Sequence, residues 1–122
     1  MTAPTILLAD DDGSIRTVVS QALGRAGYEV KAAGNAATLW RWVSDGEGDL
    51  VITDVQMPHL DGFGLLSAIR EDPVLVRMPV ILVTSLERRE DRARGLALGA
   101  DAYIVKRQFS QDELLSTIRQ LL

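Results

Sequence analysis

The sequence predicts a doubly wound α/β domain, in which five parallel strands alternate with five helices. Short apolar runs bounded by turn residues recur along the chain, as in strands buried on both faces of a sheet. Between these runs lie segments with apolar residues at helical spacing. Right-handed crossovers then place helices on both faces of one parallel sheet. The length of 122 residues fits one domain, so we expect a single unit over residues 1–122.

The predicted strands are apolar or alternating runs that end in polar or breaker residues. Leu50 to Ile52 is wholly apolar, and Met57 and Pro58 stop regular structure after it, because proline lacks an N–H and restricts the residue before it. In chain order the predicted strands are Thr5–Ala9, Tyr28–Ala32, Leu50–Asp54, Pro79–Thr84 and Ala102–Val105.

The predicted helices follow the strands and carry apolar residues three and four positions apart. In chain order they are Ser14–Ala26, Ala36–Val43, Phe63–Arg70, Glu87–Leu98 and Gln111–Leu121. Polar residues can cap the first turns and glycine can end a helix. These signals are Asp12 or Ser14 and then Gly27 for the first helix, Asn35 for the second, Gly99 after the fourth and Ser110 for the last.

Composition excludes several classes of protein. The net charge of −4 argues against non-specific binding to nucleic acid. The absence of cysteine excludes disulfides and thiolate metal sites. Apolar runs fall short of the ~20 residues that span a membrane, and the N-terminus lacks the features of a signal peptide. We therefore expect a cytoplasmic protein that contacts neither membrane nor nucleic acid.

Polar residues at the ends of four predicted strands carry the chemistry. They are Asp10 and Asp11, Asp54, Thr84 and Lys106. Because the carboxyl ends of parallel strands share one edge of a sheet, these side chains can converge there. Oxygen ligands without cysteine or a nearby histidine suit Mg²⁺ or Mn²⁺, which would relieve repulsion between the carboxylates. With a lysine and a hydroxyl beside the metal, the central carboxylate can attack a phosphoryl group.

Other functions stay open at this point. Asp54 alone is compatible with an ordinary turn residue. Asp10 and Asp12 have the spacing of an aspartate-based phosphatase, which usually carries its nucleophile after the first strand. A flavin-binding protein would need a hydroxyl-rich loop where this chain has three aspartates. A fold of this kind used only as a binding or scaffold module, with an impaired phosphorylation site, is the remaining alternative.

Several motifs resemble the receiver domain of bacterial response regulators, and together they span essentially the whole chain. They are Ile6–Asp11, Asp54 with Met57-Pro58 and Asp61-Gly62, Thr84-Ser85, and Gly99–Tyr103 with Lys106. The resemblance implies a flavodoxin-like (βα)5 fold with strand order 2-1-3-4-5. It also implies a phosphoacceptor of a two-component system that assists its own phosphorylation and dephosphorylation without being an enzyme in the usual sense.

The resemblance further implies a role for each site residue. Asp54 would take a phosphoryl group from a histidine kinase, and Lys106 would hold the phosphoryl oxygens. Mg²⁺ would be bound directly by three groups and through water by a fourth, which are Asp11, Asp54, the carbonyl of Gln56 and, through water, Asp10. Thr84 and Tyr103 would form the switch pair, although Tyr103 also fits an ordinary half-buried strand aromatic.

Three features depart from the family pattern. Three consecutive acids, Asp10 to Asp12, stand where the family uses two, and counting back from Ile15 selects the first two. Arg107 follows the lysine where the family has proline after a cis bond, so that bond can be trans. The first half resembles receivers of nitrogen-regulation activators, and the second half resembles those of chemotaxis-type histidine kinases. A natural hybrid or an engineered chimera joined near residues 53–56 would have this pattern.

The remaining expectations concern the surface. In the resembling family a protein partner docks on the fourth helix and fifth strand, and we expect a monomer or a weak dimer. We expect His59 to be a solvated loop residue. Trp40 and Trp42 are two positions apart and cannot share a helix face, so one should pack and the other should be exposed.

Overall fold

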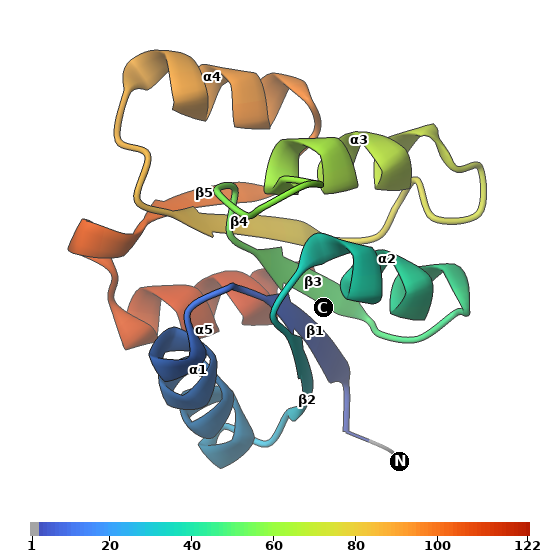
Figure 1. Cartoon of the computed structure of the whole chain (residues 1–122). Coiled ribbons are helices and arrows are strands. Elements are labelled where there is room, and N and C mark those ends of the chain that lie inside the picture. The colour runs from blue at the N-terminus through green and yellow to red at the C-terminus, as the bar shows by residue number, and fades with distance from the viewer. Residues whose placement is uncertain (1–2) are drawn as a thin grey trace.

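The computed structural model describes residues 3–122 and forms a five-stranded parallel sheet in the order β2-β1-β3-β4-β5. The strands are β1 (Thr5–Ala9), β2 (Glu29–Ala33), β3 (Leu50–Thr53), β4 (Val80–Thr84) and β5 (Ala102–Val105). Figure 1 shows the twisted sheet between two layers of helices. The predicted flavodoxin-like fold class and strand order are confirmed.

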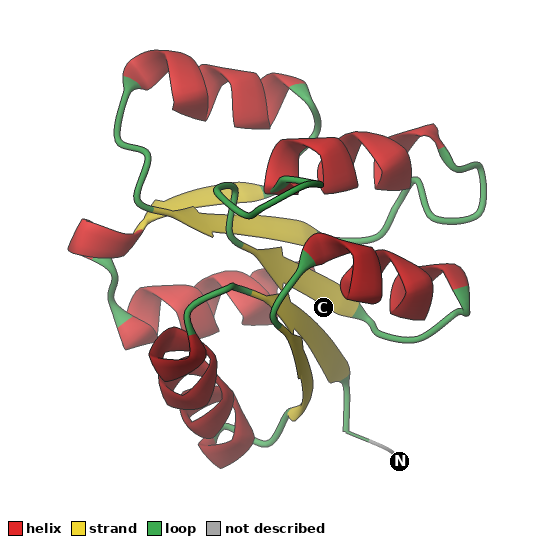
Figure 2. Cartoon of the chain, in the orientation of Figure 1, coloured by secondary structure: helices red, strands yellow, loops and turns green. Residues whose placement is uncertain are grey.

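Five α-helices and one short 3₁₀ turn connect the strands (Figure 2). They are α1 (Gly13–Arg25), α2 (Ala36–Ser44), α3 (Gly62–Glu71), α4 (Arg89–Ala97), η1 (Lys106–Gln108) and α5 (Gln111–Leu121). Helices α1 and α5 cover one face of the sheet, and α2, α3 and α4 cover the other (Figure 1). Among the residues described, no helix is both long and apolar enough to cross a membrane.

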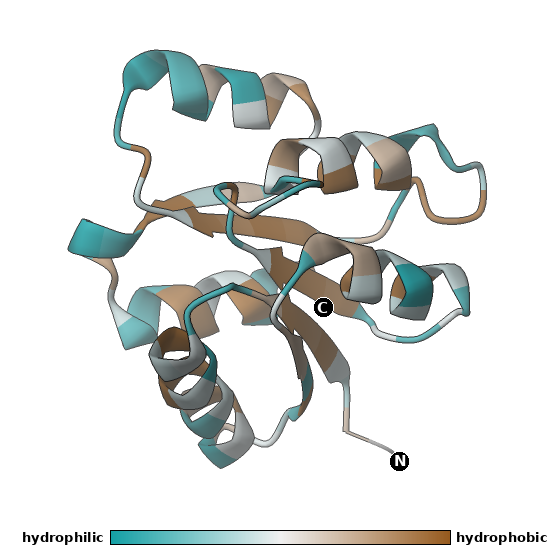
Figure 3. Cartoon of the chain, in the orientation of Figure 1, coloured by the Kyte–Doolittle hydropathy of each residue, from teal (hydrophilic) through white to brown (hydrophobic). Residues whose placement is uncertain are grey.

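Strand side chains divide between the two cores because successive residues of a strand point to opposite faces. In β1, Leu7 packs against α2 and α3, whereas Ile6 and Leu8 pack against α1 and α5. Strands β1, β3 and β4 are therefore mostly apolar and drawn largely in brown in Figure 3, whereas the edge strand β2 carries Glu29 and Lys31. This double burial fixes the register of β1, β3 and β4, and it brings their carboxyl ends to one edge.

Side chains cap four of the helices at the positions that local sequence allows. Asp12 accepts hydrogen bonds from the backbone N–H groups of Ser14 and Ile15, which decides between the two candidate caps of α1. Asn35 and Ser110 cap α2 and α5 as predicted, and Asp61 caps α3. Each cap satisfies a donor that the first helical turn leaves free.

Several boundaries and one packing prediction differ from the sequence expectations. Helix α4 begins at Arg89 instead of Glu87, because no side chain caps its N-terminus and the preceding residues are extended. The short turn η1 was not predicted, and the bond from Lys106 to Arg107 is trans. Trp40 and Trp42 are both half-buried against the core, so the prediction that one would be exposed is wrong.

The neighbouring strand explains why neither tryptophan is exposed. Lys31 of β2 lies 4.4 Å from the centroid of the Trp42 ring and pairs with Glu47 at 2.6 Å. The lysine therefore covers a ring that the helix alone would leave open to solvent.

Candidate functional site

Three carboxylates meet at the carboxyl edge of the sheet, where predicted. One oxygen from each of Asp10, Asp11 and Asp54 lies within 4.8 Å of the others. Asp10 follows β1 and Asp54 follows β3, and both are buried, whereas Asp11 is exposed. The pairing of these two neighbouring strands places Asp10 and Asp54 side by side. Such a set of oxygens suits a hard divalent cation.

Lys106 reaches the same cluster from the end of β5. Its Nζ lies 2.9 Å from Asp54 Oδ2 and 2.9 Å from Asp10 Oδ2. One ammonium group thus donates to two buried carboxylates, although the lysine is 52 residues from Asp54 in the chain. The described cluster carries three negative charges and one positive charge, so it retains an excess of negative charge for a cation to balance.

Burial and the ion pairs shift two pKa values in the cluster. Burial raises the pKa of Asp10 above its usual 3.8, although the hydrogen bond from Lys106 and the backbone N–H of Asp12 oppose the shift. Burial alone would lower the pKa of Lys106, but the hydrogen bonds to Asp10 and Asp54 outweigh it and raise the value above 10.5. Lys106 is therefore positively charged at neutral pH.

The loop after β1 separates the roles of the three consecutive acids. Asp10 Oδ1 accepts the backbone N–H of Asp12 at 2.9 Å, which orients the Asp10 carboxylate. Asp12 turns its own side chain to the first turn of α1 and contributes nothing to the three-acid cluster. The first two of the three consecutive acids therefore lie in the cluster, and the third lies outside it. Arg16 also donates to the backbone carbonyl of Asp10 at 2.6 Å and holds this loop.

The predicted switch residues, Thr84 and Tyr103, are joined through one intervening residue. Thr84 is fully buried, and its Oγ1 accepts the backbone N–H of Leu86 at 3.2 Å. Tyr103 is buried beneath α4, and its hydroxyl donates to the carbonyl of Leu86 at 2.9 Å. Tyr103 is thus more buried than the half-buried strand aromatic considered from sequence. Burial, followed by the charge of Asp91, raises the pKa of its hydroxyl.

The loop after β3 orients the side chain of Asp54 through a backbone N–H group. The backbone N–H of Gln56 donates to Asp54 Oδ1 at 3.3 Å, and the Gln56 side chain accepts from the Ser85 hydroxyl at 2.7 Å. A Cβ at Gly62 would overlap the carbonyl oxygen of Asp54, so only glycine permits this approach of α3. The motif Asp61-Gly62 therefore caps α3 and positions Asp54 at the same time.

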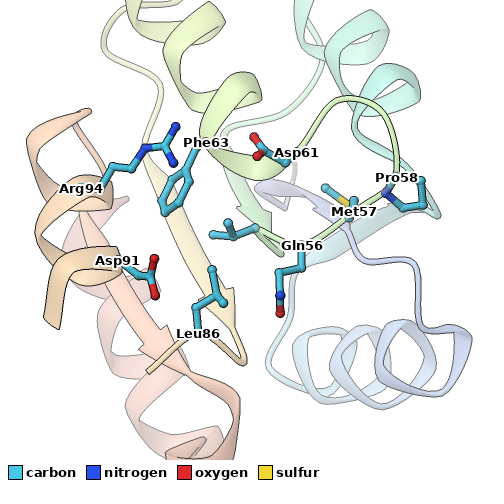
Figure 4. Close-up of a pocket in the computed structure, with 9 residues that line it drawn as sticks. Gln56, Met57, Pro58, Asp61, Phe63, Leu86, Asp91 and Arg94 are labelled. Atoms are coloured by element: carbon cyan, nitrogen blue, oxygen red, sulfur yellow. The ribbon is translucent and has the colours of Figure 1, made fainter. Parts of the chain in front are cut away.

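A hollow of about 480 Å³ adjoins the cluster on the side of α4. In Figure 4, Asp91 and Arg94 of α4 face Gln56, Met57 and Asp61 across it. The guanidinium of Arg94 lies 4.5 Å from the centroid of the Phe63 ring. The carboxylates of Asp10 and Asp11 do not line this hollow, which shares only Gln56 with the site. His59, expected to be solvated, is exposed and has a positive φ of 68°.

Sequence reasoning missed the residues that act through their backbone or through the lack of a side chain. Leu86 forms hydrogen bonds with both switch residues through its main chain, and no property of a leucine indicates this. Gly95 is the buried residue of α4 and faces Tyr103, and it was not singled out from the sequence. The glycine itself was the available signal, because glycine disfavours a helix interior.

Together the parallel sheet, the three acids and the bridging lysine form a doubly wound α/β domain whose acidic site fits phosphoryl chemistry. The model of the response regulator receiver domain matches residues 6–119. The chain therefore belongs to the response regulator receiver domain family.

Relatives and solved structures agree with this assignment. The chain is 49% identical, over 122 residues, to the DNA-binding transcriptional regulator NtrC of Bradyrhizobium sp. (strain RP501 Parasponia), covering 100% of this chain and 25% of that protein. The chemotaxis response regulator CheY4 of Vibrio cholerae superposes with a TM-score of 0.89 at 33% identity, covering 99% and 100% of the two chains. TrrA of Thermotoga maritima, solved in complex with Mg²⁺ and BeF, gives a TM-score of 0.85 at 32% identity and covers 100% of both chains.

This chain spans about a quarter of the length of the NtrC relatives it matches.

Proposed function

We propose that the chain is a phosphoacceptor, in which Asp54 takes a phosphoryl group from the phosphohistidine of a histidine kinase. The observation that carries the proposal is the convergence of three carboxylates within 4.8 Å around one lysine that bonds two of them. Asp54 is the acid at the centre of the sheet, on the strand between β1 and β4. Its backbone N–H donates to Ala9 of β1, and its side chain accepts the backbone N–H of Gln56 in the loop that follows it.

The donor set fits Mg²⁺. Asp10, Asp11 and Asp54 offer carboxylate oxygens, the carbonyl of Gln56 follows two residues after Asp54, and no sulfur competes. By the family pattern, Asp11, Asp54 and the Gln56 carbonyl would hold the ion, with Asp10 assisting through water. When bound, Mg²⁺ supplies positive charge that reduces repulsion among the acids and between them and the phosphoryl oxygens.

The transfer step forms one bond and breaks another. A carboxylate oxygen of Asp54 bonds to phosphorus while the bond from phosphorus to the imidazole nitrogen breaks, and the imidazole leaves with the bonding electrons. Lys106, which is positively charged and faces the carboxylate, attracts the phosphoryl oxygens. Thr84 then offers its hydroxyl proton to a phosphoryl oxygen, and a rearrangement of this hydroxyl is felt by Leu86, whose backbone N–H donates to the same oxygen. The rearrangement links chemistry at Asp54 to Tyr103.

Mass spectrometry after incubation with acetyl phosphate tests the proposal. We expect a gain of one phosphoryl group in the parent with Mg²⁺ and none in Asp54→Asn. A matched control is Asp61→Asn, which alters a nearby acid that caps α3 and lies outside the three-acid cluster. Equal labelling of Asp54→Asn would place the chemistry elsewhere. No labelling of the parent would favour a receiver fold used as a binding module.

We further propose how the domain is organised and where a partner binds it. The chain acts as one domain over residues 1–122, as a monomer or weak dimer in the cytoplasm. Its output partner docks at the face of α4 and β5. A join near residues 53–56, natural or engineered, accounts for the two family branches that its halves resemble.

A further inference from the structure

The loop after β1 is tied to helix α1 by Arg16, which lies near the N-terminus of that helix. Its Nη1 donates to the backbone carbonyl of Asp10 at 2.6 Å. The side chain is half-buried, and within the described part of the chain it forms no ion pair with a carboxylate. The guanidinium therefore serves as a hydrogen-bond donor to the backbone instead of a partner for an acid.

The same guanidinium lies against the turn that follows β2. A Cβ added to Gly34 would be 3.3 Å from Arg16 Nη1, and a Cβ added to Gly13 would be 3.4 Å from Arg16 Nη2. The backbone N–H of Asp10 donates in turn to the carbonyl of Ala33, at the end of β2. Arg16 and the backbone of Asp10 thus connect α1, the loop after β1 and the turn after β2.

These contacts bear on Asp11, the exposed member of the three-acid cluster. The hydrogen bonds and ion pairs that the described residues make to the cluster go to the carboxylates of Asp10 and Asp54. The direction of the Asp11 side chain is therefore set by its backbone. The carbonyl of Asp10 belongs to the peptide group that leads into Asp11, and a peptide group is planar. A donor fixed on this carbonyl restricts the direction in which the Asp11 side chain leaves the loop.

We infer that Arg16 is a positioning residue of the acidic site, which orients Asp11 by holding the carbonyl of Asp10. The hold on the loop stands on these contacts alone, whereas its consequence for Mg²⁺ rests on the proposed function. Helix stability does not account for an arginine at this place, because positive charge is unfavourable near the N-terminus of a helix. The charge of Arg16 would by itself weaken the binding of Mg²⁺, because like charges repel.

Exchange of backbone amide protons with water, measured by NMR without metal, tests the hold on the loop. The amide of Asp12 is the probe, because it donates to Asp10 Oδ1 in the same loop. Arg25→Met is the matched control for Arg16→Met, since Arg25 is an exposed arginine at the other end of α1. We expect exchange at Asp12 to be several-fold faster in Arg16→Met than in the parent, and unchanged in Arg25→Met. Equal exchange in all three proteins would overturn the inference.

Titration with Mg²⁺, followed by calorimetry, tests the link to the metal site. We expect Arg16→Met to weaken binding about tenfold, as the loss of a group that orients a metal ligand does. Arg25→Met should bind Mg²⁺ as the parent does. A purely structural role of Arg16 would lower the free energy of unfolding and leave the Mg²⁺ affinity of the folded protein unchanged, and a role of its charge would raise that affinity. Either of these two results would contradict the inference.

A second variant keeps both measurements decisive. If Arg16→Met lacks the circular dichroism of the parent, Arg16→Lys takes its place, because a lysine keeps the charge and lacks the planar group with several donors. Faster exchange and weaker binding are again expected, and values equal to those of the parent would refute the role of Arg16. A parent that does not bind Mg²⁺ would instead contradict the proposed function, while amide exchange still decides the role of Arg16.

Discussion

Asp10, Asp11 and Asp12 are adjacent in the chain, yet three different environments surround them. Asp10 is buried and bonded to Lys106, Asp11 is exposed within the acid cluster, and Asp12 caps α1. A carboxylate in a metal site and a carboxylate at a helix end respond differently to removal. The difference gives a test at the scale of single residues.

We expect Asp11→Ala and Asp12→Ala to have opposite effects. Asp12→Ala removes the cap of α1 and should lower the free energy of unfolding by about 1 kcal/mol, while Mg²⁺ still stabilises the protein. Asp11→Ala should leave metal-free stability unchanged or higher and should abolish most of the stabilisation by Mg²⁺. Thermal unfolding with and without Mg²⁺ measures both effects. Loss of the Mg²⁺ response in Asp12→Ala would show that the metal site had been assigned to the wrong pair of acids.

Asp54 provides a second prediction at this scale. Without metal, Asp54 repels Asp10 and Asp11 in the folded state, and only Lys106 offsets the repulsion. Asp54→Asn should therefore raise metal-free stability by about 1 kcal/mol, after screening by solvent. Millimolar Mg²⁺ should stabilise the parent more than the variant, so the two melting temperatures should converge as Mg²⁺ rises. A parent melting temperature that does not respond to Mg²⁺ would contradict the acid site.

Substitution of Lys106 distinguishes its effect on phosphoryl oxygens from its effect on metal binding. Lys106→Met removes the positive neighbour of the acids, so Mg²⁺ affinity should stay equal or rise. Labelling by acetyl phosphate should fall at least tenfold, the effect of losing a charge-assisted contact worth ~1.5–3 kcal/mol. Arg107→Met is the control, because Arg107 is exposed and pairs with Glu87 outside the cluster. Weaker Mg²⁺ binding with normal labelling would show that the lysine has another role.

At the scale of elements, Arg70 at the end of α3 connects two distant turns. Its guanidinium donates to the carbonyls of Gly99, Val76 and Met78, and it pairs with Asp101 at 3.1 Å. The contacts join α3 to the loop before β4 and to the turn between α4 and β5. A planar group with several fixed donors is needed to reach all of them.

We expect Arg70→Lys to lower the free energy of unfolding by ~2–3 kcal/mol, because a lysine ammonium cannot satisfy these separated carbonyls. Chemical denaturation measures the loss. Arg119→Lys, an exposed residue on α5, provides the control and should stay within ~0.5 kcal/mol of the parent. Similar stability of the two variants would mean that the carbonyls find other partners when the guanidinium is removed.

At the scale of the whole molecule, two raised pKa values predict how stability responds to alkaline pH. The folded state holds the protons of Tyr103 and Lys106 more tightly than the unfolded chain, whose groups titrate near 10.0 and 10.5. Between the unfolded and folded pKa values the native state binds more protons, so stability falls as pH rises. Stability from both groups is fully present below pH 10 and is lost above it.

Denaturation at a series of pH values from 8 upward measures this loss. Tyr103→Phe should reduce the slope above pH 10. The difference in phenolate absorbance between the parent and Tyr103→Phe reports the ionisation of Tyr103 directly. The pKa measured in this way should lie above the usual value of 10.0. Ionisation of Tyr103 at or below that value would contradict the buried position of the ring.

Much of the architecture follows from interactions between residues close in the chain. The apolar runs, the breakers after them and the caps Asn35 and Ser110 act within a few positions, so the sequence alone predicted five strands, five helices and most of their limits. Local signals were weakest at α4, which lacks a side-chain cap and an apolar face, and there the predicted start was two residues too early. Once the strands alternate with helices, a parallel sheet also follows, and with it the shared edge that gathers the acids.

Only the tertiary structure decided how the gathered groups contact each other. Lys106 bonds two carboxylates, and one of them is 52 residues away, so the contact depends on the pairing of four strands and on no local preference. Tyr103 is buried against Gly95, which belongs to another element. Lys31 likewise covers Trp42 from a neighbouring strand. Local sequence specifies which elements form, whereas close packing between elements fixes side-chain positions, because each depends on atoms that many separate segments bring together.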